Sequence, residues 1–184
     1  PAGRKSAVQG DYTSIDRYVA KLQAAVRSHK LVAVSDFDGP VRFRSTGSLT
    51  TLGRQGVYYL EYCGLDLDPT KATGVDQNAI EFMRLLASYF VMMPALPTAM
   101  VSQVNAQADK LTTQVTMENP TTASAQAQPA SQVLDALADF AKAYGLPASD
   151  TVLLRHLKAR VTDPKLTPSA QVAQQPDLLN WVIK

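Results

Sequence analysis

The chain has 184 residues, 46% of them hydrophobic, and a single cysteine, Cys63. This composition excludes a wholly disordered chain and a disulfide-stabilised scaffold, and it favours one domain with appended segments. The net charge of +2 is unevenly distributed: residues 1–60 carry nine Lys/Arg against four Asp/Glu, residues 61–150 four against ten, and residues 151–184 five against two. Such segregation suits a subunit whose basic region meets an acidic partner or the acidic region of a neighbouring copy.

Membrane and export signals are not visible in the sequence. No stretch of about 18 apolar residues occurs, and the first residues, "PAGRKSAVQGDY", lack the apolar block of a secretory signal. We therefore expect no membrane association and a location in the cytoplasm or in a virion.

The first predicted element is an amphipathic helix that starts near Thr13. Apolar side chains recur at helical spacing from Ile15 to Val26, and Thr13 with Asp16 offers a capping pair. Arg17 and Lys21 lie one turn apart on its polar side.

A small β element is predicted between residues 31 and 62. The runs "LVAV", "VRFR" and "VYYLEY" are rich in β-branched and aromatic residues and are separated by turn-forming residues, which indicates a hairpin or a three-stranded patch. In a strand, Arg42 and Arg44 would share one face, with Arg54 close in sequence. The guanidinium groups of arginine and nearby hydroxyl groups are suitable phosphate ligands.

The remainder of the chain is predicted to be helical. Residues 75–94 are apolar nearly all round and indicate a buried central helix that stops at Pro94. The following segment carries a narrow apolar seam, Val101 to Val115, which is typical of packing along another helix of the same chain. We therefore divide the chain into an N-terminal arm and helical core (1–118), a linker (119–131), a helical hairpin (132–167) and a C-terminal arm (168–184).

The C-terminal arm ends in a compact apolar plug that contains the only tryptophan of the sequence. Such a terminus must dock on its own core or on a neighbouring subunit. We predict that it forms a subunit interface through Leu178, Leu179, Trp181, Val182 and Ile183.

The stretch "SDFDGPV" resembles the first motif of the haloacid dehalogenase superfamily. The resemblance covers about seven residues and implies that Asp36 is a nucleophile, that Asp38 is an acid/base and that both help to hold magnesium. The family's threonine or valine after the glycine is here Pro40, and the strand–helix units of a parallel sheet are not visible. We prefer the interpretation that Asp38, Gly39 and Pro40 form a turn.

Other catalytic patterns are weaker still. His29 and His156 have no metal-binding partner nearby in sequence. The apolar surroundings of Cys63 predict a buried structural cysteine. The glycines are not spaced as in a phosphate-binding loop. We predict no catalytic residue, no metal site and no cofactor.

The sequence thus favours a mainly α-helical protein with a small β element and extended terminal arms. In build it looks like the coat proteins or nucleoproteins of filamentous viruses. We predict a self-assembling, non-enzymatic subunit that packages nucleic acid, RNA rather than DNA, by contacting the phosphate backbone through Arg17, Lys21, Arg42, Arg44 and Arg54. The alternatives are a phosphatase-like enzyme that uses Asp36 and Asp38, and a helical adaptor that binds another protein.

Overall fold

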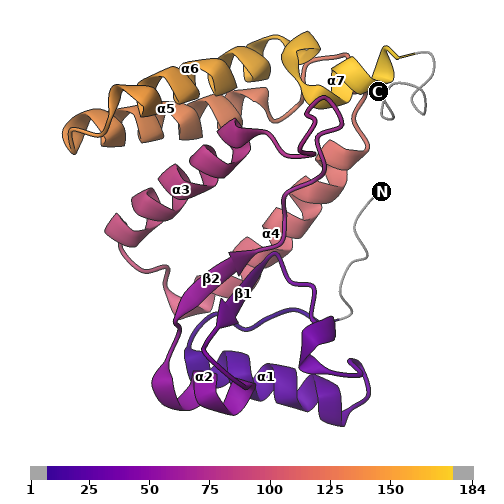
Figure 1. The fold of residues 1–184 in the computed structure, drawn as a ribbon, viewed down its shortest axis with the longest axis vertical. Helices are drawn as coiled ribbons and strands as arrows, with labels where there is room; N and C mark the ends of the chain where they lie inside the picture. The colour runs from indigo at the N-terminus through magenta and orange to yellow at the C-terminus, as the bar shows by residue number, and fades with distance from the viewer. Residues whose placement is uncertain (1–7, 176–184) are drawn as a thin grey trace. The chain divides into compact units, whose positions relative to one another are not determined.

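A computed structural model describes residues 8–175 of the chain. These residues form a mainly helical structure with one small two-stranded antiparallel sheet, which confirms the predicted fold class (Figure 1). No helix among them is both long and apolar enough to cross a membrane. The plug residues Leu178, Leu179, Trp181, Val182 and Ile183 lie outside the described part of the chain.

The chain divides into two compact units. Among the described residues, unit 1 comprises 8–65 and 96–105, and unit 2 comprises 66–95 and 106–175. The four-part division into residues 1–118, 119–131, 132–167 and 168–184 remains a prediction.

Unit 1 begins with helix α1, Ile15–Arg27. Its N-cap is Ser14, whose hydroxyl accepts a hydrogen bond from the Arg17 amide, so the cap lies one residue after the predicted Thr13. The short helix α2, Leu49–Gln55, packs against α1 and is capped in the same way by Ser48. Between them in sequence lies the 3₁₀ turn η1, Val34–Asp36. The preceding run "LVAV", residues 31–34, for which the sequence suggested a strand, is not a strand in the structure.

The hairpin of unit 1 pairs β1, Val41–Arg44, with β2, Tyr59–Tyr62. The strands are antiparallel, and Arg42 lies opposite Glu61. This arrangement confirms the predicted small β element in its two-stranded form.

A single hydrophobic cluster forms the core of unit 1. The apolar face of α1 contributes Tyr18 and Leu22, the loop before β1 contributes Phe37, and α2 contributes Leu52. Each of these four side chains is almost completely buried. The cluster therefore holds α1, α2 and the start of β1 together.

Unit 2 is built from helices. Helix α4, Thr98–Thr116, is shared between the units, and the other elements are α3, Gln77–Met92, α5, Ala127–Ala143, α6, Ala148–Thr162, η2, Pro164–Leu166, and α7, Pro168–Ala173. Helix α5 starts four residues before the Ser131 cap that the sequence suggested. Helices α5 and α6 lie side by side as a hairpin, and α3 packs against both (Figure 1).

The interpretation of α3 as a helix buried on all sides is wrong. Only Leu85 is fully buried, whereas Val91 keeps 82% of its surface exposed. Leu85 packs with Leu134 and Leu137 of α5 and with Leu154 of α6, so one stripe of α3 supplies its contribution to the core.

Ion pairs connect the helices of unit 2. Arg84 of α3 pairs with the buried carboxylate of Asp150 in α6, and Lys158 of α6 pairs with Asp135 of α5. Arg160 of α6 donates to the buried N-cap carboxylate of α3, Asp76, at 2.7 Å. These pairs fix the positions of the helices around a small leucine core.

The central position of Leu85 can be tested by truncation. Replacing Leu85 with Ala should lower the free energy of unfolding by about 2–5 kcal/mol, because it leaves a cavity among three leucines. Replacing Ile80 of the same helix, which is 53% exposed, should change it by less than about 0.5 kcal/mol. Urea unfolding followed by circular dichroism measures both, and equal effects would contradict this description of the core.

The Asp76–Arg160 pair predicts a pH dependence of stability. Burial by itself raises the pKa of Asp76, but hydrogen bonds from Arg160 and from the Asn78 amide outweigh it and hold the pKa below its usual value. The ionised carboxylate therefore stabilises the fold above the pKa of the unfolded chain, about 3.9, and this contribution is lost as the pH falls through the folded pKa.

Asp76→Asn isolates this charge, because Asn is an equally good N-cap. The variant should be less stable than the parent near pH 7, and the difference should shrink below about pH 4. Asp135→Asn, which removes an exposed pair, serves as the control and should cost about 0–1 kcal/mol. A stability difference for Asp76→Asn that is the same at pH 7 and pH 3 would show that the charge is not the cause.

Candidate functional site

The outer edge of β1 is held by two tyrosine hydroxyls. Tyr12 donates to the Val41 carbonyl at 2.6 Å, and the Tyr18 hydroxyl accepts from the Phe43 amide at 3.3 Å. The Cys63 amide donates to the Pro40 carbonyl, so the even-numbered residues of β1 direct their backbone groups to β2. The tyrosines therefore satisfy backbone groups on the edge that β2 leaves open.

The same tyrosines belong to an aromatic cluster beneath β1. The ring centroid of Tyr18 lies 4.7 Å from the ring centroid of Phe43, 5.6 Å from that of Tyr12 and 6.0 Å from that of Phe37. Burial raises the pKa of Tyr12 to about 12 and also raises the pKa of Tyr18. Both phenols therefore keep their protons at neutral pH and act as hydrogen-bonding groups.

Successive side chains of a strand point to opposite faces. Because Phe43 faces the aromatic cluster, its neighbours Arg42 and Arg44 lie on the opposite face of β1. Both arginines approach a single carboxylate oxygen, Oε2 of Glu61 on β2. Arg44 lies 2.6 Å from it through Nε and 2.5 Å through Nη2, whereas Nη1 of Arg42 is 3.8 Å away. The Nε atom of Arg42 is buried and has no hydrogen-bond partner among the described residues.

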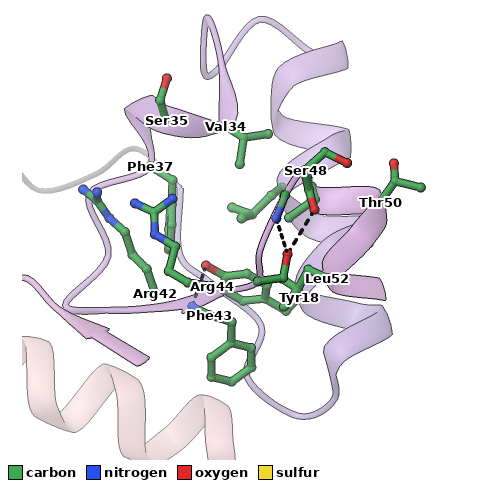
Figure 2. Close-up of a pocket in the computed structure, with 14 residues that line it drawn as sticks. Tyr18, Val34, Ser35, Phe37, Arg42, Phe43, Arg44, Ser48, Thr50 and Leu52 are labelled. Atoms are coloured by element: carbon green, nitrogen blue, oxygen red, sulfur yellow. Dashed lines mark hydrogen bonds between the residues drawn. The ribbon is translucent and has the colours of Figure 1, made fainter. Parts of the chain in front are cut away.

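A pocket of about 430 Å³ lies beside these arginines (Figure 2). Figure 2 shows the side chains of Arg42 and Arg44 extending from β1 in the same direction, on the side of the pocket where Phe37 lies. The apolar part of its lining comes from the core of unit 1 and the polar part from β1 and the turn before α2. The lining residues are Tyr18, Leu22, Val34, Ser35, Phe37, Arg42, Phe43, Arg44, Ser45, Gly47, Ser48, Leu49, Thr50 and Leu52.

The predicted basic set is only partly brought together. Arg42 and Arg44 line the pocket, whereas Arg17 and Lys21 of α1 and Arg54 of α2 do not and are exposed. Sequence reasoning missed Glu61, although the hairpin register that pairs it with Arg42 gives a signal for it: an acidic residue within an otherwise apolar strand.

The two aspartates of the dehalogenase-like stretch lie in a 3₁₀ turn and in the loop that follows it. Asp36 closes the turn η1, where its Oδ2 atom accepts from the Ala33 amide at 2.8 Å. Asp38 lies in the loop before β1. The adjoining sheet is an antiparallel hairpin and not the parallel sheet that the resemblance implies, which favours the turn interpretation.

The cysteine and the histidines are placed as follows. Cys63 is exposed, so its interpretation as a buried cysteine is wrong. His29 follows the end of α1 with a φ of 55°, and His156 lies on α6. Within residues 8–175, no cluster of three or more His, Cys, Asp or Glu side chains has the arrangement of a metal site.

The chain is similar to part of several longer bacterial proteins. The chain is 71% identical, over all 184 residues, to part of the glutathione biosynthesis bifunctional protein GshAB of Lactiplantibacillus plantarum, of which it covers 24%. It is 26% identical over 163 residues, 89% of its length, to 22% of the Streptococcus agalactiae protein of the same name. The chain thus spans about a quarter of the length of these relatives. No family model matches it.

Two solved structures share the fold. A bifunctional glutathione synthetase from Pasteurella multocida matches 92% of this chain with a TM-score of 0.75 at 21% identity, over 22% of its own length. A glutamate–cysteine ligase from Francisella tularensis, solved in complex with AMP, matches the whole chain with a TM-score of 0.78 at 18% identity, over 44% of its own length.

These relatives overturn the function predicted from the sequence. The prediction of a virion coat protein or nucleoprotein that packages nucleic acid is wrong, because the similar proteins are bacterial and are named for glutathione biosynthesis. The prediction of a non-enzymatic chain is contradicted by the same names, and RNA or DNA partners have no support. Charge segregation and a helical build are shared by many kinds of protein and do not distinguish a nucleic-acid-packaging subunit from a segment of an enzyme.

The tyrosine contacts of β1 give a testable prediction. Tyr18→Phe keeps the buried ring but removes the acceptor for the Phe43 amide, so it should lower the free energy of unfolding by about 1 kcal/mol. Hydrogen exchange of the Phe43 amide should accelerate by more than global destabilisation explains. Tyr144→Phe, at a 57% exposed position, is the control and should change neither quantity. Unaltered exchange at Phe43 in Tyr18→Phe would argue against this role.

Proposed function

We propose that this chain is a segment of a bacterial glutathione biosynthesis enzyme and that it belongs to the part that joins glutamate to cysteine. The observation that carries the proposal is the 71% identity to the Lactiplantibacillus plantarum bifunctional protein, which extends over the whole chain. At that level of identity, we expect the two segments to fold alike.

The assignment to the ligase part has separate support. The Francisella tularensis structure carries the name of the glutamate–cysteine ligase alone, and its fold matches all of this chain. Since the chain corresponds to 44% of that protein, the ligase site would also need residues from the remaining sequence.

The polar surface of unit 1 is chemically compatible with this role. Joining a carboxylate to an amine requires a site that holds anionic groups, and Arg42 with Arg44 provides two guanidinium groups beside one carboxylate. We also retain the predicted cytoplasmic location as part of this proposal. Cys63 of this segment is exposed and free, and free cysteines are typical of proteins in a reducing compartment.

A hybrid enzyme tests the proposal. This chain would replace the 184 matching residues of the Lactiplantibacillus plantarum protein, and the formation of the glutamate–cysteine dipeptide would be measured. We expect a rate within about tenfold of the parent, which corresponds to at most about 1.4 kcal/mol in the barrier.

The second activity of the bifunctional protein provides the control. Conversion of supplied dipeptide to glutathione should be the same in the hybrid and in the parent if the remainder of the polypeptide is intact. A hybrid that forms glutathione from the dipeptide but does not join glutamate to cysteine would overturn the proposed function.

A further inference from the structure

We propose that the apolar seam of helix α4 is an intramolecular docking surface and that a helix from the remainder of the longer enzyme packs along it. This proposal rests on the proposed function, because it takes the partner helix from the part of the relatives' length that this chain does not span. The seam consists of five residues of α4: Val101, Val104, Ala108, Leu111 and Val115.

The spacing of the seam specifies the kind of partner. Its residues follow one another at intervals of three, four, three and four positions, which places them on a single narrow stripe of the helix. This is the repeat of a helix that packs lengthwise against one other helix. A helix that covers a globular core has a broader apolar face.

The described residues leave this seam largely uncovered. Within residues 8–175, helix α4 has no buried residue and contributes to neither hydrophobic cluster. Val104 keeps 42% of its surface exposed, and Val115 keeps 46%. The partner helix that the sequence predicted for this seam is therefore not among the helices that form these two clusters.

The composition of α4 argues against a helix that is stable without a partner. Seven of its 19 residues are valine or threonine, and these side chains lose rotational freedom in a helix. The stability of such a helix comes mainly from the packing of its apolar side. Because α4 belongs to no core within the described part of the chain, we infer that its packing surface lies elsewhere in the polypeptide.

The residues beside the seam favour a partner in the same polypeptide over a separate chain. In helix pairs between separate chains, charged residues that flank the seam select the partner. The charged residues of α4, Asp109 and Lys110, lie away from the seam. A tethered partner needs no such selection, because its effective concentration is high. The flanking positions of α4 are uncharged: Asn105, Gln107, Thr112 and Gln114.

Hydrogen exchange compares α4 with and without the remainder of the enzyme. The samples are the 184-residue chain and the hybrid enzyme described above. In the hybrid, the amides of residues 101–115 should exchange at least about tenfold more slowly than in the isolated chain, because packing suppresses local opening. The amides of α5, which already belongs to a core within the chain, should change less. Equal exchange of α4 in both samples would overturn the proposal.

Matched substitutions in the hybrid separate the seam from the rest of α4. Leu111→Asp places a charge within the seam, whereas Gln103→Asp places the same charge at an exposed position away from it. Leu111→Asp should abolish the slow exchange of α4, because a buried charge without a partner is unfavourable. Gln103→Asp should exchange as the parent hybrid does. Equal exchange in the two variants would reject the seam as the docking surface, whether or not the isolated chain folds.

Cross-linking identifies what covers the seam. Ala108, the middle residue of the seam, is replaced in the hybrid by the photo-reactive p-benzoylphenylalanine, and the linked peptide is identified by mass spectrometry. We expect a peptide from the part of the polypeptide outside these 184 residues. A cross-link to residues 176–184, a cross-link to an isotope-labelled second copy, or no cross-link at all would each overturn the choice of partner.

The outcomes distinguish this proposal from the proposed function. A hybrid that joins glutamate to cysteine while α4 exchanges as in the isolated chain would leave the ligase function standing and reject the docking surface. A hybrid that does not join them, but shows slow exchange and the expected cross-link on α4, would support the docking surface and reject the ligase function.

Discussion

The hydrogen bonds from Tyr12 and Tyr18 to the outer edge of β1 are the constraint on which the candidate site depends. A two-stranded hairpin of four-residue strands is marginally stable alone. The hydroxyls satisfy the Val41 carbonyl and the Phe43 amide, and the rings pack against Phe43. Because side chains alternate along a strand, fixing Phe43 against the aromatic cluster directs its two arginine neighbours away from it.

The two units use charged residues differently. In unit 2, Arg84, Lys158 and Arg160 each contact a carboxylate of another element, and these pairs hold the helices in place. In unit 1, Arg42 and Arg44 share one carboxylate, and the Nε atom of Arg42 has no partner in the described part of the chain. Unit 2 also contains a buried charged group that is only partly paired, because Oδ2 of Asp150 has no hydrogen-bond partner among the described residues. An unpartnered atom on a buried charge therefore does not by itself mark a binding site.

Much of the fold could be predicted from local sequence patterns. The apolar periodicity of α1, the Gly145 and Pro147 stop signals after α5 and the arginine alternation of β1 are properties of a few neighbouring residues. The burial of α3 could not be predicted, because it depends on which of its apolar side chains meet α5 and α6. Similarly, Glu61 belongs to the site only through the register that places it opposite Arg42, and that register is a pairing of distant residues.

Exposed apolar side chains do not distinguish a self-assembling subunit from a segment of a larger enzyme. Exposed apolar side chains indicate contact with another surface, but they do not identify that surface. In this chain Tyr58 is 77% exposed, Phe90 64% and Met117 84%. A self-assembling subunit would cover such residues with copies of itself. Under the proposed function, the remaining three quarters of a longer polypeptide would cover them instead.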